Sequence, residues 1–84
     1  MTNHPFRPVK PGEILQEELE VRGWLQADLV VLLGQPAQTI NEILEGKRAV
    51  TSDLALLLSK ALGTSPDYWL NLESAYQLDL LSGP

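Results

Sequence analysis

The chain has 84 residues, with eleven acidic and six basic side chains and a formal net charge of −5. This length allows one small domain with a single core and excludes a core that wraps around a large cofactor. The absence of cysteine excludes disulfides, thiolate metal sites and thiol nucleophiles. The longest purely apolar runs have five residues. A membrane span needs roughly 20, so we expect a soluble, cytoplasmic protein with no membrane partner.

The acidic balance limits how the chain can bind nucleic acid. Strong nucleic-acid binders usually carry a basic surface, the opposite of this composition. Residues 51–84 have one basic and four acidic side chains, so this third is the poorest candidate for contacting phosphate. DNA binding therefore requires a locally basic face, and we expect it to weaken at high salt.

The first predicted helix follows an extended arm over residues 1–10. Pro11 suits the first turn of a helix, where its missing N–H costs nothing. Gly23 supplies the left-handed residue that commonly ends a helix. The apolar spacing between them predicts an inward face with four aliphatic side chains: Ile14, Leu15, Leu19 and Val21.

Two short helices are predicted next, separated by only about three residues. The first covers residues 26–33 and stops at Gly34, and its inward side chains are expected to be Leu29, Leu32 and Leu33. The second covers residues 36–44, with Pro36 in its first turn. Its apolar residues at i, i+3 and i+4 spacing predict a buried stripe of Ile40, Ile43 and Leu44.

The last two predicted helices are marked by capping residues. Thr51 is a cap for an apolar helix that ends at Gly63. Thr64 or Ser65 caps a final helix that starts at Pro66 and reaches about residue 81. Five helices without a strand signal predict an all-α five-helix bundle. We expect a single domain over residues 11–81, followed by a tail over residues 82–84.

The short pair of helices over residues 26–33 and 36–44 has the pattern of a helix-turn-helix. Its tight turn contains glycine, and its second helix is polar on one side. Gln26, Val30 and Gly34 follow one another at four-residue spacing. This spacing resembles the phage-repressor-like (XRE) helix-turn-helix, whose second helix enters the major groove of DNA.

Longer stretches of the chain resemble the HigA antitoxin family, also called the VapI-like group. The resemblance rests on the strings PGEILQEEL, TINEILEGKRAVT and GTSPDYWLNLESAYQL in that order, from Pro11 to about Leu78. It implies a cytoplasmic, homodimeric antitoxin that binds double-stranded operator DNA. It also implies a partner, a HigB-type mRNA-cleaving toxin, which the antitoxin neutralises while repressing their shared operon.

The resemblance also implies which side chains contact DNA. The base-reading positions fall on the exposed side of the third helix, at Ala37, Gln38, Asn41 and Glu42. Glutamine and asparagine can each make a bidentate contact to adenine, worth roughly 1–3 kcal/mol of discrimination. The positions that contact phosphate are Gln26, Thr39, Lys47 and Arg48. Gln26 is further expected to brace Gln38.

Four residues depart from the family pattern. Leu25 stands where a Ser or Thr cap is usual, and Pro36 replaces a Ser cap. Val30 replaces the small alanine at the closest contact between the two short helices. Ala37 holds a position that is often polar or basic, so one base reader is missing. These departures leave the fold unchanged but reduce the expected number of base contacts.

Two aromatic features have readings other than DNA binding. The stripe on the last helix is expected first as core and also as a dimer seam, and it consists of Trp69, Leu72, Tyr76 and Leu80. Trp24, directly after Gly23, is expected to pack on the core.

No residue pattern points to catalysis or to a cofactor. The chain has no Ser–His–Asp set, phosphate loop or metal-ligand cluster, and its one histidine, His4, lies in the arm. We therefore expect no enzyme, no metal and no cofactor. Two alternatives stay open. One is an interaction module of the same fold with weak or lost DNA binding, favoured by the net charge, by Ala37 and by the apolar pair Val30–Val31. The other is a free-standing regulator without a toxin.

Overall fold

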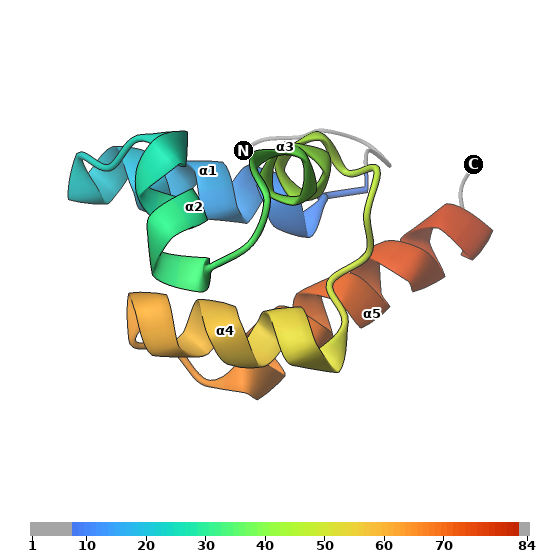
Figure 1. The fold of residues 1–84 in the computed structure, drawn as a ribbon. Coiled ribbons are helices and arrows are strands. Elements are labelled where there is room, and N and C mark those ends of the chain that lie inside the picture. Colours follow the sequence, from blue (N-terminus) through green and yellow to red (C-terminus); the bar gives the residue numbers. More distant parts are fainter. Residues whose placement is uncertain (1–7, 83–84) are drawn as a thin grey trace.

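The computed structural model describes residues 8–82 and confirms an all-α fold (Figure 1). Most of the expected N-terminal arm and the end of the expected tail lie outside these residues, as does His4. No strand is present between residues 8 and 82. The five helices are α1 (Pro11–Arg22), α2 (Gln26–Leu33), α3 (Ala37–Glu45), α4 (Ser52–Leu62) and α5 (Pro66–Ser82).

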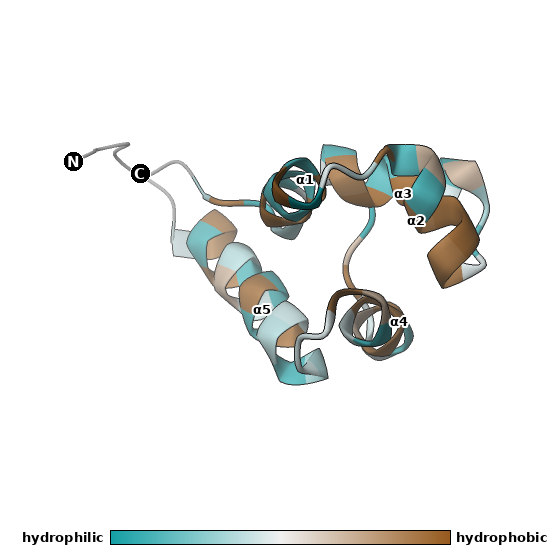
Figure 2. Ribbon diagram, turned by 90° about the vertical axis from the view of Figure 1, so that its left-hand side faces the viewer, coloured by the Kyte–Doolittle hydropathy of each residue, from teal (hydrophilic) through white to brown (hydrophobic). Residues whose placement is uncertain are grey.

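The helices pack in two groups that α2 connects. α1 packs across α3, and α4 packs against α5, while α2 contacts both α3 and α4. α5 also touches α1, but its C-terminal half extends beyond the rest of the bundle (Figures 1 and 2). This arrangement leaves one side of α3 uncovered.

Each helix contributes to one continuous core. Its buried apolar side chains are Leu15, Leu19, Leu29, Leu33, Ile40, Ile43, Val50, Leu54, Ala55, Leu58, Leu62 and Trp69. Leu44, expected to be buried, is only half-buried against this core.

Two side chains that were expected to face inward lie in solvent instead. Val21 is 85% exposed and Leu32 is 52% exposed. On α1 the contacting stripe is the i, i+4 pair Leu15 and Leu19, and a residue two positions further points to the opposite side of the helix. On α2 the pair Leu29 and Leu33 fills the same role, which turns Leu32 to the flank of a helix only eight residues long.

Glycine at position 12 allows α1 to approach α3 closely. Gly12 is buried, and a β-carbon placed on it would lie 2.6 Å from the carbonyl oxygen of Leu44 and closer still to that of Ile43. Both atoms belong to the backbone and cannot rotate away. The absence of a side chain at this position therefore sets the distance between α1 and the helix that carries the candidate site.

Side-chain caps fix where the last two helices begin. The Thr51 hydroxyl oxygen accepts from the Leu54 N–H at 3.3 Å, as expected. Of the two alternatives at α5, Ser65 is the cap, because its hydroxyl oxygen accepts from the Tyr68 N–H at 3.2 Å. Thr64 serves the core instead, since its hydroxyl accepts from the Trp69 indole N–H at 2.8 Å.

Candidate nucleic-acid interface

The turn between α2 and α3 is short and firmly held. Gly34 has a left-handed backbone with φ of 64°, and its N–H donates to the Val30 carbonyl at 3.0 Å. Pro36 is the N-cap of α3 rather than its first residue, so the helix covers Ala37–Glu45, one residue later at each end than predicted. Buried Ile40 and Ile43 anchor α3 in the core.

The missing cap of α2 is replaced from within the helix. Leu25 has no polar side chain, but the Asp28 carboxylate accepts from the Leu25 backbone N–H at 2.8 Å. A carboxylate in the first turn also interacts favourably with the helix dipole. Val30 is half-buried and packs against the core, so the bundle accommodates the larger side chain there.

The uncovered side of α3 carries the candidate base-reading residues. Ala37, Gln38 and Asn41 are exposed, and Thr39 and Glu42 are half-buried. Ala37 and Asn41 are four residues apart and therefore share a helix face with Gln38 beside them. None of the three contributes to the core, so this face is available to a partner.

Glu42 is the centre of the polar contacts on this side of the molecule. Its Oε1 accepts from Arg48 Nε at 2.9 Å and forms an ion pair with Nη2 at 2.7 Å. Its Oε2 accepts from the Gln38 amide at 3.2 Å. The Arg48 guanidinium, and after it the Gln38 amide, hold the pKa of the Glu42 carboxyl below its usual value. The sequence suggested that Gln26 would brace Gln38. In the structure Glu42 braces Gln38 instead.

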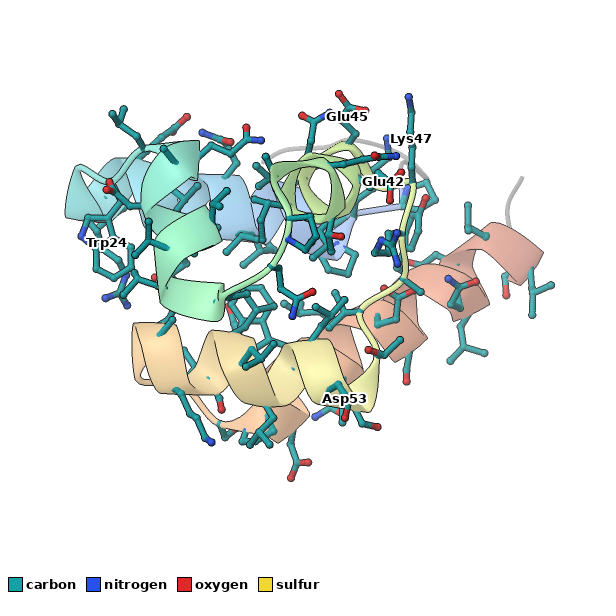
Figure 3. All side chains as sticks on the ribbon, viewed as in Figure 1. Trp24, Glu42, Glu45, Lys47 and Asp53 are labelled. Atoms are coloured by element: carbon teal, nitrogen blue, oxygen red, sulfur yellow. The ribbon has the colours of Figure 1, made fainter. Side chains whose placement is uncertain are left out.

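The loop after α3 is fixed by the end of the helix. Gly46 adopts a left-handed backbone with φ of 78°, and the Glu42 carbonyl accepts from the backbone N–H of Lys47 at 2.8 Å and of Arg48 at 3.3 Å. The Lys47 ammonium lies 3.2 Å from Glu45 Oε1, and its side chain is 72% exposed. In Figure 3, Glu45 and Lys47 point away from the side of the molecule that α4 occupies.

A third cation joins Lys47 and Arg48 that sequence reasoning missed. The aliphatic stem of Lys10, at the start of α1, lies against Gly46, where a β-carbon would come within 2.5 Å of the Lys10 Cδ. No sequence spacing connects residues 10 and 46. They meet only because α1 packs against α3. We refer to Lys10, Lys47 and Arg48 as the basic cluster.

Gln26, the remaining candidate for phosphate contact, is exposed at the first position of α2. The nearby Asp28 carboxylate is bound to the Leu25 N–H and places a negative charge at the same helix end. Gln26 can therefore donate to a phosphate oxygen, while Asp28 opposes the approach of the anion.

The aromatic stripe of α5 divides between the core and the surface. Trp69 is completely buried and donates to Thr64, so the expectation that it forms part of a dimer seam is wrong. The reason is that α4 and α5 close around the indole. Leu72 and Tyr76 are half-buried and Leu80 is 51% exposed, and these three remain available.

Trp24 packs partly on the core, and the Arg22 guanidinium lies over its ring at 5.3 Å from the ring centroid. Beside it, α1 and α2 expose four aliphatic side chains: Val21, Leu25, Val31 and Leu32. A shallow hollow on this surface is lined by Trp24, Asp28, Val31 and Leu32.

Residues 8–82 contain no group of three or more His, Asp or Glu side chains that could hold a metal ion. Within the same residues, none of the helices has the length and hydrophobicity needed to cross a membrane.

Taken together, the Gly34 turn, the anchored α3 and its uncovered polar face define a helix-turn-helix protein. A family model described as helix-turn-helix matches residues 15–69. An uncharacterised HTH-type transcriptional regulator of Escherichia coli, YddM, is 36% identical over 78 residues, which cover 93% of this chain and 79% of the relative. Antitoxin HigA-1 of Vibrio cholerae is 36% identical over 73 residues, which cover 86% of this chain and 69% of the relative.

Solved structures of HigA-family proteins superpose on this chain. An addiction module antidote protein of the HigA family from Coxiella burnetii superposes with a TM-score of 0.83 and 43% identity, covering 88% of this chain and 82% of that chain. The Pseudomonas aeruginosa antitoxin HigA, solved with the higBA promoter, superposes with a TM-score of 0.84 and 37% identity, covering 89% and 83%.

The chain belongs to the XRE-type helix-turn-helix family, in the group that includes the HigA antitoxins. Its members are DNA-binding regulators and not enzymes, which confirms the non-enzymatic assignment made from the sequence.

Proposed function

We propose that the chain is a DNA-binding repressor of the HigA antitoxin type, which reads operator DNA with α3. The observation that carries this proposal is the pairing of an exposed polar face, Gln38 and Asn41, with the adjacent basic cluster. The solved HigA of P. aeruginosa, similar over 89% of this chain, contains promoter DNA. A locally basic edge beside polar base-reading residues is what an acidic chain needs to approach a duplex.

In this proposal the base readers divide the work by chemistry. Asn41 presents an amide that can bond adenine in two places, and Gln38 can do the same once it leaves Glu42. The Ala37 side chain has no hydrogen-bond donor but offers a methyl group to a thymine methyl. Three neighbouring positions thus favour an A·T-containing site.

Phosphate contacts come from both ends of the motif. Lys10 and Lys47 flank the recognition helix on one side, and Gln26 and Thr39 can donate from the other. Arg48 joins them when it exchanges Glu42 for a phosphate oxygen. These contacts position the protein on the duplex without reading its sequence.

A homodimer would place two recognition helices in successive major grooves, with centres about 34 Å apart. Leu72, Tyr76 and Leu80 on α5 are our candidates for the seam, because they form the part of the stripe that the core does not consume. We propose a cytoplasmic HigB-type mRNA-cleaving toxin as the protein partner. A basic toxin would complement the net charge of −5 and associate faster for that reason.

One observation favours a second function, an interaction module with little DNA binding. Val31 and Leu32 are exposed and line one shallow hollow with Trp24, and exposed apolar surfaces commonly mark binding sites. The absence of a short toxin-sized reading frame beside the gene would favour the free-standing regulator instead.

Two substitutions test the proposed roles on α3 and the basic cluster. Asn41→Ala should cost roughly 1–3 kcal/mol on DNA from upstream of the gene and little on a scrambled duplex. Lys47→Ala should weaken binding to both duplexes similarly. It should also reduce the slope of log affinity against log salt concentration by about one unit. Unchanged discrimination by the Asn41→Ala protein would refute base reading by this helix.

A further inference from the structure

Two side chains assigned to DNA contact are already bound to a carboxylate of the same chain. Glu42 Oε1 accepts a hydrogen bond from Arg48 Nε at 2.9 Å and forms an ion pair with Nη2 at 2.7 Å, and Oε2 accepts from Gln38 at 3.2 Å. An anionic oxygen therefore occupies the Nε–Nη2 edge of Arg48, the edge on which a guanidinium usually binds phosphate. The main chain reinforces the arrangement, because the Glu42 carbonyl accepts from the Arg48 N–H at 3.3 Å.

The neighbouring ion pair, which joins the end of α3 to the loop that follows, has a different geometry. Glu45 meets Lys47 through one contact of 3.2 Å, and the Lys47 side chain is 72% exposed against 47% for Arg48. Exposed single-contact pairs of this kind contribute little and are screened by salt. Lys47 is thus free to approach any duplex, whereas Arg48 must first leave Glu42.

We propose that Glu42 is a specificity-determining residue, which withholds Arg48 and Gln38 from DNA until base contacts offset the exchange. The inference rests on the proposed function and deepens it. On a duplex of arbitrary sequence, only phosphate attraction opposes the Glu42 contacts, so Arg48 stays with its carboxylate. On the operator, the base contacts of Asn41 and Gln38 add to that attraction, and Arg48 transfers to phosphate.

The charge state of Glu42 supports this role. Arg48, and then Gln38, lower the pKa of the carboxyl, so the anion persists throughout the neutral range. The basic side chains that act on it are Arg48 and Lys47. The carboxylate therefore competes with phosphate under every condition in which the protein meets DNA.

Replacement of Glu42 by its uncharged isostere tests the proposal. For the Glu42→Gln protein, fluorescence anisotropy should show affinity for a scrambled duplex rising about two- to fivefold and affinity for the upstream duplex rising much less. The salt slope on the scrambled duplex should steepen by about 0.9, the value for one added phosphate contact. Discrimination between the duplexes therefore falls.

Glu45→Gln is the matched control. It removes the same charge from the same helix without removing a contact to Arg48 or Gln38. It should therefore change the affinity for both duplexes by one common factor. The proposal is wrong if Glu42→Gln changes the affinity for both duplexes by the same factor, and if that factor equals the one seen for Glu45→Gln. In that case only the net charge of the protein affects binding.

Arg48→Gln separates a withheld guanidinium from simple repulsion. In the Arg48→Gln background, Glu42→Gln should raise the affinity for the scrambled duplex no more than Glu45→Gln does. The reason is that no guanidinium remains to be released. A persisting excess would overturn the proposal. Thermal unfolding of each variant checks that it is folded, and the capping carbonyl of residue 42 is retained in all of them.

The wild-type protein distinguishes the two levels of the argument. If it binds upstream and scrambled DNA equally, the proposed function and this inference fall together. If it discriminates but Glu42→Gln discriminates as well as wild type, the repressor function stands and only the role of Glu42 is refuted.

Discussion

The position of the recognition helix depends on the missing side chain at residue 12. In a Gly12→Ala protein, the new β-carbon would lie 2.6 Å from the Leu44 carbonyl oxygen and closer to that of Ile43. Because neither atom can rotate away, α1 and α3 must separate. Overpacking of this kind costs about 1–3 kcal/mol, while alanine regains at most about 1 kcal/mol of helix propensity.

We therefore expect Gly12→Ala to lower the free energy of unfolding by about 1–2 kcal/mol. For a domain of this size that corresponds to a decrease in Tm of roughly 4–16 °C. Thermal unfolding followed by circular dichroism measures it, with the exposed substitution Gln16→Ala on the same helix as control. A Gly12→Ala protein as stable as wild type would refute the close packing of α1 on α3.

Three further predictions concern the core, a cap and an ion pair. Trp69→Ala should destabilise the fold by about 3–5 kcal/mol in urea denaturation, because it empties the core and leaves Thr64 unpaired; a loss below 1 kcal/mol would contradict its burial. Thr51→Ala should cost about 1 kcal/mol in the same assay, through loss of the α4 cap, and an unchanged midpoint would contradict that role. The pKa of Glu42 in the folded protein is lowered from 4.5. Its ion pair should therefore stabilise the protein fully above pH 4.5, and the stabilisation should be lost as the pH falls through the folded-state pKa. The Tm difference between wild type and Glu42→Gln should accordingly shrink on acidification, and a growing difference would contradict the pairing.

Local signals predicted the helices well, because each is written within a few residues of the feature it marks. The Thr51 cap and the turn at Gly34 depend only on neighbouring backbone groups. Pro36 was misplaced by one position because its fixed φ suits both the N-cap and the first helical residue. Val21 was misassigned because it lies two positions beyond Leu19 and therefore on the opposite side of α1. Leu32 was misassigned because apolar periodicity does not reveal which flank of an eight-residue helix meets a neighbour.

Two contacts within the candidate site were less predictable, because one crosses a turn and the other joins distant parts of the chain. Arg48 reaches Glu42 across the left-handed turn at Gly46, where helical spacing rules no longer apply. Lys10 meets Gly46 only through the packing of α1 on α3. Sequence reasoning could therefore identify the residue types suited to DNA, but not the carboxylate that binds two of them.

Equilibrium binding of the wild-type protein shows whether α3 reads the sequence of DNA. Fluorescence anisotropy would compare the duplex from upstream of the gene with a scrambled duplex at two salt concentrations. We expect tighter binding to the upstream duplex, weakening as salt rises. Equal binding to both duplexes at both concentrations would contradict it and would favour the interaction module.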